Sequence, residues 1–139
     1  MEVIRRNTDY AFRLMAKLAE KYGENIPASE LAKDTHVSYQ LTCKLLQKLS
    51  KASLVESKMG SNGGYKLADK PKNINLRQIV EAVQGPIVFN LCLKGKKYNC
   101  PMSDDCPIRG YLRKMQNDMN KQFDNTTLAC LLNKPQGKS

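Results

Sequence analysis

The feature that most constrains the fold lies between residues 28 and 67, where helical and extended patterns follow one another closely. Residues 28–34 predict a short helix. After a turn, Ser38 can cap a second helix that extends to about residue 52. The buried stripe of that second helix consists of Leu41, Leu45, Leu46 and Leu49. Two helices joined by so short a turn predict a helix-turn-helix.

A predicted β-hairpin follows the second helix directly. Residues 54–58 and 65–67 are extended segments, and the tip at residues 59–64 holds three glycines. No helix starts after the tip and no Gly-Lys-Ser/Thr sequence ends it, which argues against a nucleotide-binding loop. A hairpin in this position is a wing. We therefore expect a mainly α-helical protein with a winged helix-turn-helix DNA-binding domain, which we place at residues 1–70.

Basic residues concentrate on this predicted unit. The formal net charge is +10, and residues 37–66 contain five lysines and one acid. Lysines that only solvate the helix are the alternative, but beside a wing they favour double-stranded DNA as the partner. The first turn of such a helix faces base edges, its lysines contact phosphates, and the wing approaches the minor groove. The candidate DNA-binding residues are Ser38, Tyr39, Gln40, Thr42, Lys44, Lys48, Lys58, Asn62 and Gly63.

Two further helices are predicted, one on each side of the helix-turn-helix and its wing. Residues 8–22 have apolar residues at helical spacing, with Thr8 as the expected N-cap. Residues 71–75 predict a linker, and Asn75 is expected to cap a short helix over residues 76–83. The loop that follows has no hydrophobic period of its own and needs something to organise it.

A longer helix is predicted from Pro107, which suits a first helical position, to about Phe123. Its apolar stripe consists of Ile108, Tyr111, Leu112, Met115, Met119 and Phe123. We prefer a dimerisation helix to an ordinary core helix, because regulators that read two half-sites are usually two-fold dimers. We assign residues 71–106 to a linker helix and a cysteine-rich loop, 107–132 to dimerisation and tail helices, and 133–139 to a disordered tail. The expected assembly is a homodimer on a pseudo-palindromic operator.

Three of the five cysteines lie within fifteen residues, at Cys92, Cys100 and Cys106. The N-terminus has no apolar stretch after its first positive charges, so we expect a cytoplasmic protein without a secretory signal or a membrane span. In a reducing compartment a group of cysteines indicates metal binding rather than disulfides. Their spacing lacks the paired knuckles of structural zinc sites. Thiolates are also the ligands of Fe–S clusters.

Three thiolates are one ligand short of the usual four. The residues alone leave Cys43, Cys130 and His36 open as the fourth, although the position of His36 in the turn before the recognition helix favours a structural role. His36 is the single histidine, and no activated-nucleophile pattern accompanies it. We therefore do not expect an enzyme.

Four short motifs occur together in this chain. They are Thr8-Asp9-Tyr10-Ala11 in the first helix, Leu54-Val55 before the wing, Gly60-x-x-Gly63-Gly64-Tyr65 at its tip, and the three cysteines after Ile87-Val88-Phe89-Asn90. In these motifs the chain resembles the Rrf-two family of transcription regulators, the group that includes IscR and NsrR. The resemblance covers about residues 1–130. Met59 departs from the pattern, because relatives often carry arginine before the wing glycine.

The resemblance implies one Fe–S cluster per subunit, 4Fe–4S in preference to 2Fe–2S, held by the three cysteines. In IscR-like members a histidine three positions after the third cysteine completes the site, but Arg109 stands there in this chain. In nitric-oxide-sensing NsrR-like members, an aspartate from the first helix of the partner subunit completes it. Asp9 stands at that position, and Arg13 four residues later can pair with it. The pattern is therefore closest to the NsrR type.

These observations predict an Fe–S cluster-dependent repressor that senses nitric oxide, redox state or iron and cluster status. One alternative of the same fold is a regulator that binds no cluster or controls cysteine metabolism. Another, of a different class, is a small Fe–S electron-transfer protein. The latter explains the cysteines but leaves the wing and the lysine-rich helix without a role.

Overall fold

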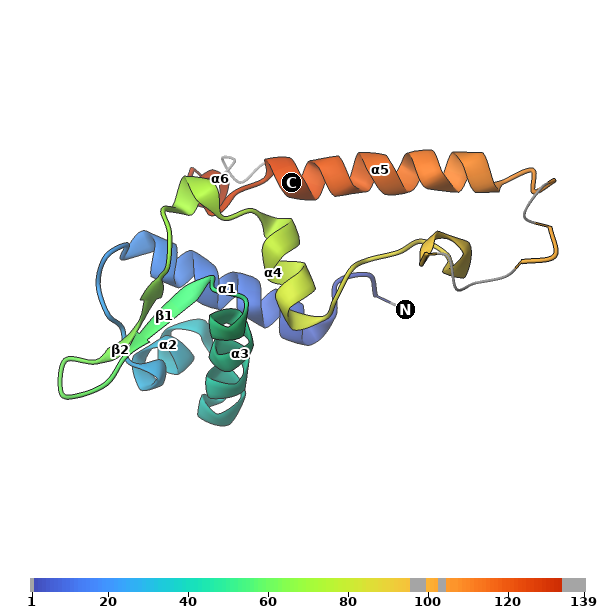
Figure 1. Cartoon of the computed structure of the whole chain (residues 1–139). Helices are drawn as coiled ribbons and strands as arrows, with labels where there is room; N and C mark the ends of the chain where they lie inside the picture. Colours follow the sequence, from blue (N-terminus) through green and yellow to red (C-terminus); the bar gives the residue numbers. More distant parts are fainter. Residues whose placement is uncertain (1, 96–99, 103–104, 134–139) are drawn as a thin grey trace.

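The computed structural model describes residues 2–95, 100–102 and 105–133 of the 139-residue chain. The protein is mainly α-helical and carries a two-stranded antiparallel hairpin, as the sequence predicts (Figure 1). The elements in chain order are α1 (Arg6–Glu20), α2 (Ala28–Thr35), α3 (Tyr39–Lys51), β1 (Val55–Lys58), β2 (Gly64–Leu67), the short 3-10 helix η1 (Pro71–Asn73), α4 (Leu76–Val83), the 3-10 helix η2 (Leu91–Leu93), α5 (Arg109–Asn125) and α6 (Leu128–Leu132).

The apolar stripes of α1, α2, α3 and α4 meet in one core. Each stripe repeats at three- and four-residue spacing, so each helix has one face to bury. The core also receives Ile74, which precedes α4, and Leu128 from α6. Side chains with no measurable exposure include Leu14, Met15, Leu31, Leu46, Leu49, Ile79 and Leu128. This packing holds α2 and α3, the predicted helix-turn-helix, on the body formed with α1 and α4.

The wing is attached to the body by its base. Its strands pair from Val55 opposite Leu67 to Lys58 opposite Gly64. The backbone of Tyr65 exchanges two hydrogen bonds of 2.8 Å with Ile26, just before α2. Gly64 lies at this junction with φ +145°, and an added Cβ would come within 2.5 Å of the Ile26 carbonyl. Glycine is therefore needed where the wing meets the body.

An arm of residues 85–125 extends from the end of α4. It passes through η2 and the cysteines, turns back, and returns along α5 to the body (Figure 1). The end of the arm is tied down, because Leu76 N–H donates to Thr126 O and Leu128 N–H donates to Ile74 O, both at 2.9 Å. None of the helices in the described ranges is long and apolar enough to cross a membrane.

The structure confirms two predicted caps. The Ser38 hydroxyl accepts from Leu41 N at 3.2 Å at the start of α3. Asn75 and Gln78 form a reciprocal capping box at the start of α4, each bond 2.9 Å long. Both caps are satisfied within three residues, so the local sequence determines them.

Two predicted helix starts are wrong. Thr8 is not an N-cap: α1 begins at Arg6, and the Arg5 carbonyl accepts from Thr8 N and Asp9 N, both at 3.0 Å. The Thr8 hydroxyl instead binds Gln84 at 2.6 Å. Pro107 precedes α5, which begins at Arg109 and runs to Asn125. The predicted loop at 90–106 also contains η2, and the predicted disordered tail lies, from residue 134 on, outside the described residues.

Candidate DNA-binding face and cysteine segment

The first turn of α3 is presented to solvent. Ser38, Tyr39 and Gln40 are exposed, with Tyr39 at 58%. A hydrogen bond with the Cys43 thiol, one turn later, raises the pKa of the Tyr39 phenol. The phenol therefore keeps its proton at neutral pH and can donate a hydrogen bond.

Thr42 has a different environment, and its predicted role at base edges is wrong. Its side chain is fully buried, and its hydroxyl has no hydrogen-bond partner among the described residues. Thr42 lies on the same helical face as Leu45, Leu46 and Leu49, which pack in the core. Early position in the helix suggested a base contact, but the face on which the residue lies determines its burial.

The lysines of α3 lie outside this buried face. Lys44 and Lys48 are exposed. Lys48 is also anchored, because its Nζ donates to Val83 O at the end of α4 at 3.2 Å. Lysine beside the carbonyl end of a helix is a favourable pairing with the helix dipole. Lys48 thus links the recognition helix to the start of the arm.

The wing carries the remaining predicted DNA-binding residues. Lys58 and Asn62 are exposed, and Gly63 is half-buried. A side chain at Gly63 would collide with the Lys58 carbonyl, so the tip closes only with glycine there. Met59 is the most exposed large apolar side chain of the described residues, at 90%. The wing therefore presents the apolar Met59 beside the polar Lys58 and Asn62 to solvent.

The three cysteines of the arm are half-buried and none forms a disulfide. Cys92 lies in η2 and lines a pocket of about 290 Å³ with Leu93, Gly95, Arg109 and Arg113. Within the described ranges, no three Cys, His, Asp or Glu side chains lie close enough together to hold a metal ion. The donor chemistry, three free thiols on one segment beside cationic side chains, fits an anionic Fe–S cluster. The single chain nevertheless does not bring these thiols into one ligand set.

Asp9 lies in the first turn of α1, and its predicted pairing with Arg13 is confirmed. The carboxylate and the guanidinium are 2.9 Å apart, with both side chains about half exposed. The Arg13 guanidinium also stacks 5.2 Å from the centre of the Tyr10 ring. Asp9 opens onto a surface pocket of about 450 Å³ that Glu2, Ile4 and Arg6 also line. An exposed carboxylate held in one direction is accessible to a second subunit.

The family model "Rrf2: Iron-dependent Transcriptional regulator" matches residues 4–134. The chain belongs to the Rrf2 family. This is the Rrf-two family that the sequence motifs indicate, and its members are transcription regulators rather than enzymes. Rrf2 regulators bind DNA and are typically dimeric.

Individual Rrf2 relatives match nearly the whole chain. The HTH-type transcriptional regulator NsrR of Halalkalibacterium halodurans is 27% identical over 126 residues, which are 90% of this chain and 86% of that one. The structure of CymR, the global cysteine regulator of B. subtilis, has a TM-score of 0.75 at 26% identity and covers 94% of this chain and 96% of that one. IscR of T. potens has a TM-score of 0.72 at 23% identity, covering 96% and 93%. The winged helix-turn-helix architecture is thus shared with these structures.

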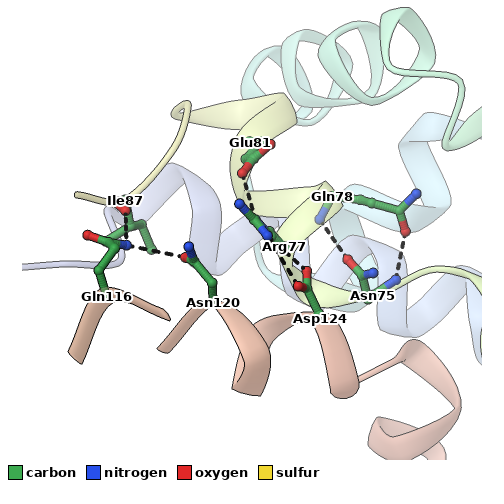
Figure 2. A network of polar contacts seen from close by, with 8 residues as sticks. All are labelled: Asn75, Arg77, Gln78, Glu81, Ile87, Gln116, Asn120 and Asp124. Atoms are coloured by element: carbon green, nitrogen blue, oxygen red, sulfur yellow. Dashed lines mark hydrogen bonds and ion pairs between the residues drawn. The ribbon is translucent and has the colours of Figure 1, made fainter. Parts of the chain in front are cut away.

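Two glutamines of this Rrf2 chain have structural roles that sequence reasoning missed. Gln116, buried in α5, accepts from Phe89 N at 2.8 Å. It also donates to Ile87 O at 2.7 Å (Figure 2). It thereby fixes the segment that leads into Cys92. Gln84, at the end of α4, binds the start of α1 through Thr8. A polar residue inside an otherwise apolar stripe is the signal that could have indicated Gln116.

Ion pairs between side chains also attach the arm of this Rrf2 protein to its body. Arg77 of α4 binds Glu81 on its own helix at 3.0 Å and Asp124 of α5 at 3.1 Å (Figure 2). The Glu81 carboxylate is the main cause that raises the pKa of Arg77. The guanidinium is therefore charged at every pH of interest, and it connects α4 to the long helix.

Proposed function

We propose that this Rrf2 protein is an Fe–S cluster-dependent repressor that binds a pseudo-palindromic operator as a homodimer. The observation that carries the proposal is the exposed, uncovered first turn of α3 beside a wing with exposed Lys58 and Asn62. In winged helix-turn-helix proteins this turn enters the major groove. The family supports regulation and DNA binding, and the cysteine segment supports a sensing role.

The exposed residues divide into base-reading and phosphate-binding groups. Gln40 is suited to adenine, because its amide can donate and accept at once, while Ser38 and Tyr39 offer hydroxyls. Lys44 and Lys48 lie where the phosphate backbone would pass, and such contacts fix position rather than sequence. The wing residues Lys58, Asn62 and Gly63 would approach the minor groove or a phosphate.

Cys92, Cys100 and Cys106 would hold the cluster, and Asp9 of the partner subunit would supply the fourth ligand. When bound, the cluster would supply sensitivity to nitric oxide, oxygen and iron limitation, because a carboxylate oxygen holds iron more weakly than thiolates do. The similarity to NsrR supports this ligand set over a histidine-completed one, since Arg109 replaces that histidine. Four ligands fit 2Fe–2S and 4Fe–4S clusters alike, and the resemblance to NsrR-like members is what favours the 4Fe–4S form.

The chain's own residues would transmit a change at the cysteine segment to the DNA-reading unit. Asp9 lies on α1 next to Thr8, which is fixed to Gln84 at the end of α4. Lys48 on the recognition helix is fixed to Val83, one residue earlier. Release of Asp9 would therefore shift α1 and α3 of one subunit relative to the other. Half-site spacing would no longer match the operator.

The exposed face of α5 would be covered by the second subunit. Ile108, Tyr111 and Met115 are each about half exposed or more, and they share one face. Apolar stripes of this length on a soluble helix indicate an interface. A second copy is the occupant that this family favours, since its members are typically dimeric.

Anaerobic purification tests the cluster directly. Wild-type protein is expected to contain iron and sulfide and to show a broad charge-transfer absorption band that nitric oxide bleaches. The triple variant C92A/C100A/C106A should lose iron, while the matched control C43A/C130A should retain it. Asp9→Ala should make the cluster labile and weaken DNA binding. Colourless, iron-free wild-type protein that binds its operator tightly would rule out the cluster-dependent function.

A regulator of cysteine metabolism is the second candidate. The structural similarity to CymR favours it, as does the lack of an assembled ligand set among the residues that the structure describes. In that case the triple cysteine variant would bind DNA like the wild type. DNA affinity would then respond to cysteine status and not to nitric oxide.

A further inference from the structure

A basic pocket of about 320 Å³ lies where the start of α1, the end of α4 and the last turn of α3 meet. Its lining residues are Arg5, Arg6, Asn7, Thr8, Lys48, Val83 and Gln84. Three of them are cationic and none is acidic. Glu2 and Asp9 line the neighbouring pocket with Arg6, but Arg13 already binds the Asp9 carboxylate. The chemistry of this pocket favours an anion.

The walls of the pocket are held in place by hydrogen bonds between elements. Gln84 Oε1 accepts from Arg5 N at 3.0 Å and from the Thr8 hydroxyl at 2.6 Å. Gln84 Nε2 donates to Val3 O at 3.0 Å, and Lys48 donates to Val83 O. An ammonium has three donors, so Lys48 retains two for a ligand. The cations therefore surround a space that is formed before any ligand arrives.

The helix geometry adds to this charge. The first N–H groups of a helix favour an anion where they lack a carbonyl partner, and the 15-residue α1 begins at this pocket. The Arg5 carbonyl accepts from Thr8 N and Asp9 N, which leaves the N–H groups of Arg6 and Asn7 for this role. Lys48 comes from the recognition helix itself. An anion bound here would thus contact the DNA-reading unit and the start of the arm together.

The start of α1 and the end of α4 line the pocket, and they lie on the other side of α3 from the wing (Figure 1). A helix in the major groove has a phosphate backbone on each side of it. The wing would meet one backbone, and the pocket would face the other. We propose that the pocket receives a backbone phosphate of the DNA, with Arg5 and Arg6 as phosphate-binding residues. This proposal rests on the proposed DNA-binding function.

Salt-dependent binding of a fluorescein-labelled 30-base-pair duplex of mixed sequence tests the proposal. Such a probe reports phosphate contacts without an operator. In the double variant R5Q/R6Q, loss of one phosphate contact should lower the magnitude of the log–log salt slope by about 0.9 and weaken binding about eightfold at 0.1 M KCl. The matched control K70Q/K72Q removes two exposed lysines beside η1 and should leave affinity and slope at wild-type values.

A second variant tests the pocket without removing an arginine. Asn7→Asp places a carboxylate in the pocket, where it should repel phosphate, while an acid at a helix N-terminus stabilises the fold. It should weaken duplex binding at low salt, with thermal unfolding unchanged or raised. Wild-type affinity and slope in either pocket variant would overturn the phosphate site and leave the proposed function standing. Failure of the wild type to bind any duplex would instead overturn the proposed function.

Discussion

The body of the molecule and its arm differ in how they bury apolar side chains. In the body, Leu14, Leu46 and Leu49 have no measurable exposure. On the arm, Tyr111 is 67% exposed and Met115 is 50% exposed, although both belong to an amphipathic stripe. The body therefore has a complete apolar core, whereas the arm leaves apolar side chains exposed. The difference indicates that the helix-turn-helix and wing are complete within the single chain, while the proposed sensing site and interface would need a second copy.

The same substitution placed in each region gives the largest expected difference. Leu46→Ala removes a fully buried side chain and should lower the free energy of unfolding by about 2–5 kcal/mol. Leu112→Ala, on the half-buried face of α5, should cost on the order of 1 kcal/mol or less. Urea denaturation followed by circular dichroism, at one low protein concentration, measures both. Equal losses would mean that the arm is as fully packed as the body.

A charge on the exposed face of the arm should separate the subunits. Met115→Glu would place a carboxylate in the expected interface and weaken dimerisation at least about 30-fold, the size of a hot-spot residue. Asn117→Glu adds the same charge on the polar face and is the matched control. Sedimentation equilibrium measures the dissociation constant of each. A Met115→Glu protein that dimerises like the control would show that another surface covers the arm.

Local sequence determines the helix caps but not the contacts between residues that are distant in the chain. The Ser38 and Asn75 caps were predictable because each bond closes within three residues. Thr8 also has the chemistry of a cap, yet its hydroxyl binds Gln84, 76 residues away, and no local pattern reports that contact. Gln116 likewise binds Ile87, 29 residues away.

The candidate site shows the same division. Residue type identified three thiols as soft ligands, because that is a property of the side chains alone. In our proposal their assembly depends on the path of the arm and on a second subunit, and the spacing of the cysteines predicts neither. Thr42 was misplaced for a related reason: its position near the helix start was visible, but which face the core covers depends on α1 and α4.

The hydrogen bonds that the buried Gln116 side chain makes within the arm should matter more than the ion pairs that join the arm to α4. Gln116→Leu leaves Phe89 N–H and Ile87 C=O without their partner, at a cost of about 1–3 kcal/mol for unsatisfied buried groups. Hydrogen exchange at the Phe89 amide should speed up, while amides of α3 keep their protection. Gln122→Leu, at an exposed position of the same helix, is the control. Unchanged exchange at Phe89 would show that Gln116 does not hold this segment.

The smallest expected effect is at the ionic connection. Arg77→Gln removes pairs with Glu81 and Asp124 whose side chains are 40% and 43% exposed. Solvent screens such pairs, so the loss should be about 0.2–1 kcal/mol and should shrink in 0.5 M NaCl.

The pH dependence of this ionic connection follows from the sign of the shift. The pKa of Arg77 is raised, so its contribution is complete below the unfolded pKa and disappears only when the pH rises through the still higher folded pKa. Between pH 6 and about pH 10 the stability difference between wild type and Arg77→Gln should therefore stay constant. A loss larger than that of Gln116→Leu would reverse the order and make the ion pairs of Arg77 more important to the arm than the hydrogen bonds of Gln116.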